Sequence, residues 1–248
     1  MQEKWIYLED VLQDQEHYEE LTKHYVSYHP DRWKLNLPIN STGWRENQVL
    51  ETETNFEWHP IMFGGKIYLV AHEPTKMLLG LGRTRGFNNC LEIFQEYSKM
   101  YTCESLGTKV ASLTIEMFES LPAHIRNIPK IAFYWLASCR TIPGYRTPAF
   151  TIFYVRNNHV DDAILNVWSG AEFFHSYPVR PVVQLPRNIL VEKDSVYCSG
   201  LSPETAWKLR WEGSQEEYKY VRRKELQVQI KEAKTLIHSL EEELNSLN

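Results

Sequence analysis

The sequence lacks the cysteine and histidine spacings that mark common metal and redox sites. Its four cysteines, Cys90, Cys103, Cys139 and Cys198, are scattered and form no CxxC pair. None of the nine histidines shows HxxxH or HExxH spacing. We therefore expect free, mostly buried thiols, and neither a metal nor another cofactor.

Long apolar runs and an excess of basic residues are also absent. No apolar stretch approaches the roughly 18 residues that cross a membrane, and residues 1–5 lack the apolar core of a secretory signal. The net charge is −5 at pH 7, so nothing favours binding to nucleic acid or to an anionic membrane. The glycines of residues 80–86 lack the Lys-Ser/Thr ending of a phosphate-binding loop.

Aromatic and aliphatic residues are plentiful in these 248 residues. Hydrophobic residues make up 43% of the chain and aromatic residues 13%, with eight Trp and fourteen Tyr. This composition suffices for a sizeable core in one large domain or in one domain with appendages. The aromatic content suits a β-rich core or a recognition surface.

The stretch from Ile131 to Leu185 contains short apolar and aromatic runs that predict an antiparallel sheet. Such runs, bounded by turn residues, are typical of buried or half-buried strands. The predicted strands are Tyr134–Ser138, Ala149–Arg156, Ala163–Trp168 and Tyr177–Leu185, and residues 156–162 between the middle two form a predicted polar hairpin loop.

The region before this sheet predicts two strands and two helices. Lys66–His72 alternates as a strand, with Ile67, Leu69 and Ala71 on one side, and residues 77–81 form a second strand. A helix begins near Asn88 or Asn89 and ends near Tyr101, with Leu91, Phe94, Tyr97 and Met100 on its buried face. A shorter helix covers Thr114–Leu121, with Thr114 as its cap and Pro122 just past its end.

Both flanks of the predicted domain differ from it. After a short extended start, residues 1–30 have apolar positions at helical spacing (Tyr18, Leu21, Tyr25 and Tyr28), and Pro30 ends this predicted helix. Residues 31–60 read as an extended arm or irregular insertion. Residues 186–199 read as a loop or an edge strand.

The C-terminal segment carries a heptad repeat. Apolar residues recur in steps of four and three, with isoleucine or leucine at a and leucine or alanine at d, which is typical of a coiled coil or a helical bundle. A helix folded back on its own domain is the alternative. The seam residues are Leu226, Ile230, Ala233, Ile237, Leu240, Leu244 and Leu247.

Several motifs together resemble a domain common in bacteriophage genomes, prophages and surface proteins of Gram-positive bacteria. The resemblance covers roughly residues 62–210. It rests on five segments: Tyr134–Ser138 (YWLAS), Val179–Leu185 (VRPVVQL), Gly86–Leu91, Ser112–Met117 and Gly200–Trp207.

This resemblance implies an α+β, C-type-lectin-like fold, distantly akin to the formylglycine-generating enzymes. We expect a mixed domain with an antiparallel sheet and two helices at residues 61–212, an N-terminal helix and arm at residues 1–60, and a coiled-coil helix at residues 213–248. The Glu-Pro-Asn and Trp-Asn-Asp motifs of calcium-dependent lectins are absent. No cysteine stands near Val179 or Arg180, where those enzymes carry reactive cysteines.

Four residues of the two central motifs have predicted structural roles. Tyr134 and Trp135 belong to a core strand, with Trp135 buried. Arg180 lies inside an apolar strand, where a charge is costly unless it is paired, so we expect it to bond to a carboxylate or to loop carbonyls. Pro181 favours an edge position or a bulge.

Two further kinds of chemistry involve a polar loop and a cysteine. His159 with Asp161 and Asp162 offers metal ligands, but turn chemistry explains this polar loop without a metal. Cys139 as a nucleophile needs a histidine within hydrogen-bond reach. We expect neither.

The sequence leaves three functional hypotheses. The first is a non-catalytic structural protein of a phage or phage-like particle (a head fibre, a capsid decoration protein, or a tail or baseplate component), whose partners are copies of itself, as a dimer or trimer, and other virion proteins. The second is a carbohydrate- or receptor-binding module that recognises a host surface through Trp168, Phe173, Phe174 and Tyr177. The third is an enzyme of unrecognised type.

Overall fold

The structure is a computed structural model in which the chain divides into two compact units, Met1–Trp211 and Glu212–Asn248. The second unit begins one residue before the C-terminal segment predicted from the heptads. The described residues are 5–31, 34–36, 49–51, 56–76, 78–81, 94–128, 133–142, 149–165, 175–192, 196 and 205–213.

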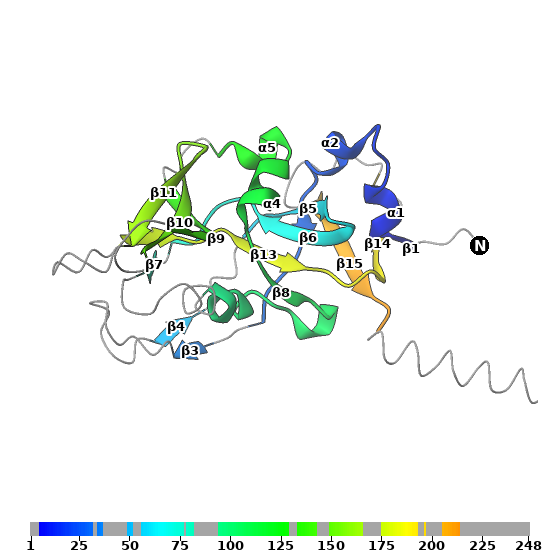
Figure 1. Cartoon of the computed structure of the whole chain (residues 1–248). Helices are drawn as coiled ribbons and strands as arrows, with labels where there is room; N and C mark the ends of the chain where they lie inside the picture. Colours follow the sequence, from blue (N-terminus) through cyan, green and yellow to red (C-terminus); the bar gives the residue numbers. More distant parts are fainter. Residues whose placement is uncertain are drawn as a thin grey trace, which may run out of the picture. The chain divides into compact units, whose positions relative to one another are not determined.

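The first unit is a mixed α+β structure made mostly of strands with a few short helices (Figure 1). Its largest sheet has the strand order β1-β14-β15-β2-β5-β6-β13-β8. These strands are β1 (Trp5–Tyr7), β14 (Ile189–Glu192), β15 (Trp207–Trp211), β2 (Val26–Ser27), β5 (Trp58–Phe63), β6 (Lys66–Ala71), β13 (Pro181–Gln184) and β8 (Lys109–Ser112). All neighbouring pairs are antiparallel except β15 and β2.

Three smaller sheets accompany it. One has the order β11-β10-β9, and the other two pair β12 with β7 and β3 with β4. Their strands are β9 (Phe133–Ile142), β10 (Ala149–Arg156), β11 (His159–Leu165), β12 (His175–Pro178), β7 (Leu78–Leu81), β3 (Lys34–Asn36) and β4 (Val49–Glu51).

The helices are short. They are α1 (Leu8–Leu12), α2 (Tyr18–Leu21), a helix at residues 94–99, a 3₁₀ turn η2 (Glu104–Leu106), α4 (Ile115–Ser120) and α5 (Ala123–Arg126). The Thr114 side chain accepts a hydrogen bond from the Met117 amide, which satisfies one free donor at the start of α4. This confirms the predicted helix with its cap.

The strands separate two hydrophobic cores, because successive side chains of a strand point to opposite faces. On β9, Trp135 enters the larger core, whereas its neighbours Tyr134 and Leu136 enter the smaller one. On β6, Ile67, Leu69 and Ala71 share the larger core, as predicted, and Tyr68 and Val70 join the smaller one.

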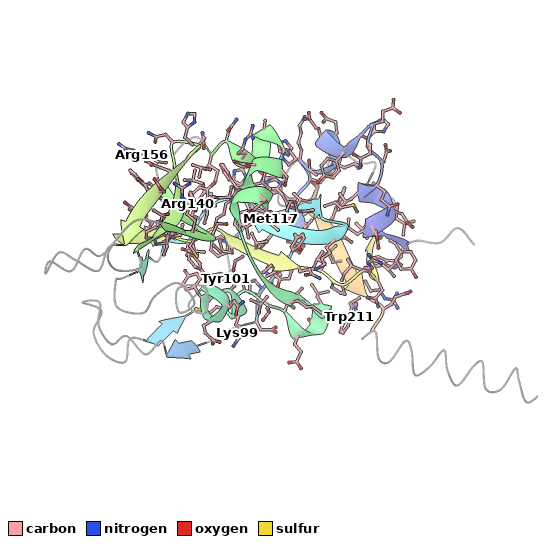
Figure 2. The ribbon with its side chains drawn as sticks, in the orientation of Figure 1. Lys99, Tyr101, Met117, Arg140, Arg156 and Trp211 are labelled. Carbon is pink, nitrogen blue, oxygen red and sulfur yellow. The ribbon has the colours of Figure 1, made fainter. Side chains whose placement is uncertain are left out.

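Different helices complete the two cores. The smaller core lies under α4 and α5, where Met117, Phe118 and Ile125 are buried; Figure 2 labels Met117 beside β6. The larger core takes Phe94, Tyr97 and Met100 from the helix at residues 94–99 and its C-terminal end, as predicted. Trp135 is 1% exposed, which confirms its predicted burial.

The predicted continuous helix up to Pro30 is wrong. Residues 5–31 form β1, α1, α2 and β2 in that order. Val26 faces Trp207 of β15 on one side and Trp58 of β5 on the other. These pairings join residues far apart in the chain, so local periodicity cannot reveal them. They override the helical spacing of Tyr18, Leu21, Tyr25 and Tyr28.

The predicted hairpin at residues 156–162 is confirmed, but its loop is shorter than predicted. The β10–β11 hairpin closes with the two residues Asn157 and Asn158, whose φ angles are +50° and +65°. Asparagine tolerates this left-handed conformation better than most residues. The following strand therefore begins at His159, before the predicted strand at residues 163–168, while β10 matches its predicted limits.

The predicted strand Tyr177–Leu185 is in fact two strands. β12 pairs with β7, whereas β13 pairs with β6 and β8 in the large sheet. Pro181 is the first residue of β13, a position where its missing N–H is tolerated inside a sheet, so the predicted edge or bulge is wrong. The region predicted as a loop or edge strand contains β14, an interior strand between β1 and β15.

The final strand of the first unit is interior as well. β15 lies between β14 and β2, and its last residue, Trp211, packs against the turn after η2. Gly107 at this turn has φ +60°, and a Cβ built on it would come within 2.5 Å of the Trp211 ring. Only glycine fits both the backbone conformation and this close approach.

Candidate functional site

Arg180 is a fully buried charged residue between β12 and β13, at 0% exposure. Its Nε donates to the Ala71 carbonyl oxygen at 2.7 Å, and one terminal nitrogen donates to the His72 carbonyl oxygen at 3.2 Å. Both carbonyls lie where β6 ends. Arg180 thus bonds to carbonyls, one of the two kinds of partner that the sequence predicted.

The positive charge of Arg180 has no bonded carboxylate among the described residues. The nearby Tyr134 side chain interacts with the guanidinium group, and the Tyr134 ring centre lies 6.0 Å from the guanidinium carbon. Burial lowers the pKa of Arg180. Burial also raises the pKa of Tyr134, against the opposing effect of the nearby positive charge. This part of the interior is therefore electropositive.

Two histidines, His59 and His72, lie near Arg180, and together with His124 we call them the histidine cluster. The Nε2 of His59 is 2.9 Å from the Nδ1 of His72, and its Nδ1 is 3.1 Å from the Thr22 carbonyl oxygen. The rings of His59 and His124 are 6.2 Å apart. These residues come from β5, the end of β6 and α5.

The partners of His59 fix where its proton lies. A carbonyl oxygen only accepts hydrogen bonds, so the Nδ1 of His59 carries a hydrogen and donates to Thr22. In a neutral ring the Nε2 of His59 is then an acceptor. The Nδ1 of His72 must therefore carry a hydrogen and donate to His59, which creates a directed relay from His72 through His59 to Thr22.

His124 contacts the same threonine from the other side. The Thr22 hydroxyl donates to the Glu19 carbonyl oxygen at 3.1 Å, and the Nε2 of His124 lies 3.5 Å from the same hydroxyl. Thr22 is fully buried at the end of α2. The Tyr25 ring lies 4.8 Å from the His59 ring. Two members of the histidine cluster, His59 and His124, thus contact the end of α2.

The surroundings keep these histidines neutral. Burial lowers the pKa of His59 to about 3, and the nearby His72, Arg180 and His124 add to this decrease. Burial and Arg180 also lower the pKa of His72, against the opposing charges of Glu57 and Glu73. The cluster therefore serves as a fixed hydrogen-bond relay at neutral pH rather than as a cationic site.

A second group of side chains, the aromatic cluster, lies on one face of β9 and β10 beside β12. Its members are Phe133, Trp135, Tyr154 and Tyr177. The Tyr177 ring stacks on Phe133 at 5.4 Å, and its centre lies 4.7 Å from Trp135 and 5.2 Å from Tyr154. Trp135 is buried, whereas the other three rings are partly exposed.

Polar groups border this aromatic cluster. The Tyr154 hydroxyl donates to an Asp161 carboxylate oxygen at 3.0 Å, and the Arg156 guanidinium lies 5.5 Å from the centre of the Phe133 ring. Arg156, on the β10–β11 hairpin, is labelled in Figure 2. Both Asp161 and Arg156 are exposed. Partly exposed rings beside hydrogen-bonding groups match the general chemistry of sugar recognition.

The structure describes only part of the predicted ligand surface. Tyr177 is half-buried within the aromatic cluster and is not a freely projecting side chain. Trp168, Phe173 and Phe174 lie outside the described residues. So do all seven heptad residues, Leu226, Ile230, Ala233, Ile237, Leu240, Leu244 and Leu247.

The residues considered for a metal site or a nucleophile do not come together in one site. His159 is exposed, Asp161 bonds to Tyr154, and Asp162 forms an ion pair with Arg140 at 3.2 Å. Within the described ranges, no group of three or more His, Cys, Asp or Glu residues is placed to hold a metal ion. Burial raises the pKa of Cys139, which lowers its thiolate fraction.

Sequence reasoning missed the histidine cluster, although a partial signal existed. Gly64 and Gly65 are typical turn residues, and the β5–β6 pairing counted outward from them brings Trp58 opposite Ala71. The next positions outward are Glu57 and His72, diagonal to His59. The contributions of Thr22 and His124 come from distant segments that no local pattern connects.

No helix in the described part of the chain is long and apolar enough to cross a membrane. Comparisons with protein-family models, with curated proteins and with solved structures give no match.

Proposed function

We propose that this chain is a non-catalytic structural protein of a bacteriophage or phage-like particle: a head fibre, a capsid decoration protein, or a tail or baseplate component. Its partners are copies of itself and other virion proteins, and its place is the virion. The observation that carries this proposal is the heptad repeat from Leu226 to Leu247, which follows a compact first unit. The resemblance of residues 62–210 to a phage-associated domain supports it.

The heptads favour self-association on physical grounds. A helix of this length is marginal by itself in water, so a docked apolar seam must supply its stability. Each large side chain that becomes fully buried contributes roughly 1.5–3 kcal/mol. Isoleucine at a with leucine at d favours a parallel dimer, whereas the small Ala233 at d and Leu236 at g leave room for a trimer.

A pair of matched substitutions tests the seam. Ile237 occupies an a position, and Thr235 occupies an f position, which faces away from the seam of a coiled coil. Ile237→Asp buries a charge at the seam and should convert the oligomer to monomers, whereas Thr235→Asp adds the same charge outside and should leave it assembled. Light scattering at micromolar concentration measures both. A wild-type monomer with no captured partner contradicts the proposal.

A second experiment tests the particle itself. Particles from a host that carries this gene are purified on a density gradient, and the chain is detected with an antibody. The proposal expects the chain to sediment with intact particles at a constant ratio to the major capsid protein. Its recovery only in the soluble fraction contradicts a virion role, even when the heptads assemble.

The aromatic cluster favours a second candidate, a carbohydrate- or receptor-binding module. Sugar rings stack on partly exposed aromatic side chains, and Asp161 offers hydrogen-bond acceptors at the edge. In a glycan array, Tyr154→Ala should abolish any signal that the wild-type chain gives, whereas Tyr7→Ala on the distant strand β1, where Tyr7 is 42% exposed, should not. Equal signals from both variants reject the aromatic cluster as the binding surface.

A further inference from the structure

The acidic excess of the chain lies in its N-terminal segment. Residues 5–31 contain seven Asp or Glu residues and one Lys, a net charge of −6, compared with −5 for the whole chain. The rest of the sequence is therefore nearly neutral. Such a one-sided charge attracts partners of the opposite sign to one part of the molecule.

This segment lines a groove of about 520 Å³, which is within the size range of ligand sites. The groove lies beside α1 and α2, which are neighbours (Figure 1). Its apolar floor consists of Ile6 from β1, Val11 from α1, Leu21 from α2 and Val196 beyond β14. Ile6 packs against the larger core and the other three belong to it, so the floor has a fixed shape. Aliphatic carbons of this kind attract the methylene stem of a long side chain.

Three carboxylates form an acidic rim on the same groove. They belong to Asp10, Asp14 and Glu20, and all three residues are exposed. Asp14 is held by His17, whose amide nitrogen and Nδ1 lie 3.3 and 3.0 Å from its two carboxylate oxygens. Glu20 is paired with Lys23. These contacts lower the pKa of the Asp14 and Glu20 carboxyl groups, so the rim is negatively charged at neutral pH.

His24 adds a hydrogen-bond acceptor to the groove. Its Nδ1 lies 3.2 Å from the carbonyl oxygens of Glu20 and Leu21. Carbonyl oxygens only accept hydrogen bonds, so Nδ1 carries the hydrogen and the Nε2 of the neutral ring is an acceptor. Stacking on the Trp207 ring at 4.6 Å fixes the orientation of the imidazole. A ligand that donates hydrogen bonds without accepting them therefore fits these groups best.

The arrangement of the rim favours an extended cationic ligand over a single ion. Among the described residues, no three His, Cys, Asp or Glu side chains are placed to hold a metal ion, so the carboxylates do not converge on one point. Ammonium and guanidinium groups only donate hydrogen bonds, and their aliphatic stems cover apolar surface. We propose that the groove binds a basic segment of a partner protein, with lysine or arginine stems on the floor and their charges at the rim. This proposal concerns the first unit alone and does not depend on the function proposed above.

Fluorescence anisotropy with the full chain tests this docking groove. The probe is a fluorescein-labelled peptide of sequence GLKRLKRLG, which should bind and saturate. The peptide GLQQLQQLG lacks the charges and should not bind. The peptide GSKRSKRSG lacks the apolar side chains and should bind at least about fivefold more weakly. No binding of GLKRLKRLG, or equal affinity for the serine peptide, overturns the proposal.

Matched substitutions locate the site on the chain. Asp10→Asn combined with Asp14→Asn removes two rim charges and should weaken the binding of GLKRLKRLG about tenfold. Glu116→Gln combined with Glu119→Gln removes two exposed charges from α4 and should change the affinity by less than about twofold, since distant exposed charges are screened. Equal losses of affinity in the two double variants contradict binding at the groove.

Lys23→Gln should strengthen binding, an outcome that a folding defect cannot imitate. The ammonium group of Lys23 occupies Glu20, so its removal makes this carboxylate available to the peptide and should raise the affinity about two- to threefold. Unchanged or weaker binding by Lys23→Gln shows that the rim does not hold the cations.

Two measurements on the wild-type chain need no substitution. When GLKRLKRLG is added, backbone amide resonances should shift at Val11 and Leu21 but not at Val160 on the β10–β11 hairpin, and equal shifts at all three overturn the proposal. Spermine, a polyamine without apolar side chains, should displace the peptide only at about tenfold higher concentration. Displacement at equal concentration assigns the groove to polyamines instead of a protein segment.

Discussion

The two cores that β9 separates differ in where their residues come from. Among the residues that the structure describes, the larger core gathers buried side chains from Leu8 to Trp207, whereas the smaller one draws on those from Ile61 to Val182. Loop-closure entropy disfavours contacts between distant segments until the packing compensates for it. The larger core therefore holds distant parts of the chain together. The smaller core is formed by hairpins and helices from the middle of the sequence.

Trp135→Ala should produce the largest loss of stability. The indole is almost fully buried in the larger core and contacts Tyr154 and Tyr177, so its truncation removes contacts between β9, β10 and β12. Truncating a buried tryptophan costs about 3–5 kcal/mol. Urea unfolding of the variant measures this change. The exposed Tyr7 serves as the control: if Trp135→Ala costs no more than Tyr7→Ala, Trp135 does not support the core.

Leu136→Ala probes the smaller core from the next residue of the same strand. Leu136 is 0% exposed and faces the side covered by α4 and α5. We expect a loss of about 3 kcal/mol in the free energy of unfolding. Fluorescence and far-ultraviolet circular dichroism should still give coincident transitions, because β9 belongs to both cores. Two separate transitions would show that the cores unfold independently.

Thr114→Ala should have the smallest effect of the three. The substitution removes the acceptor for the Met117 amide at the start of α4, and the loss of a helix cap costs about 1 kcal/mol. Thr114→Ser retains the hydroxyl and should recover most of that loss. Thermal unfolding of both variants provides the comparison, and equal melting temperatures would mean that the cap is not stabilising.

The difference between local and long-range contacts explains how much of the fold could be predicted from the sequence. The helix after Thr114 and the strand Ala149–Arg156 were predictable because their caps, turns and apolar patterns are local. The strand at Val26 was not, since its identity depends on Trp58 and Trp207, which lie far along the chain. Tyr25 and Tyr28 have helical spacing all the same, so the local signal pointed to the wrong element.

In the candidate sites, too, local features were predictable and contacts between distant segments were not. Arg180 was predictable because a charge within an apolar run is conspicuous and requires partners. Which carbonyls it bonds to was not, because Ala71 and His72 reach it only through the pairing of β6 with β13. Similarly, no motif links His59 to Thr22, since the bond joins a side chain to a backbone carbonyl, which leaves no sequence signature.

The interior position of β15 has a mechanical consequence. Any tension on the chain beyond residue 211 enters the first unit through this strand, and we consider the part of the force that lies along its axis. The hydrogen bonds to β14 and β2 on its two sides then bear the load together in shear, instead of opening one after another as in a peeled edge strand. Gly107 lies so close to the Trp211 ring at the end of this strand that a larger side chain would not fit between them. A force along this strand is therefore shared between the pairing with β14 and the pairing with β2.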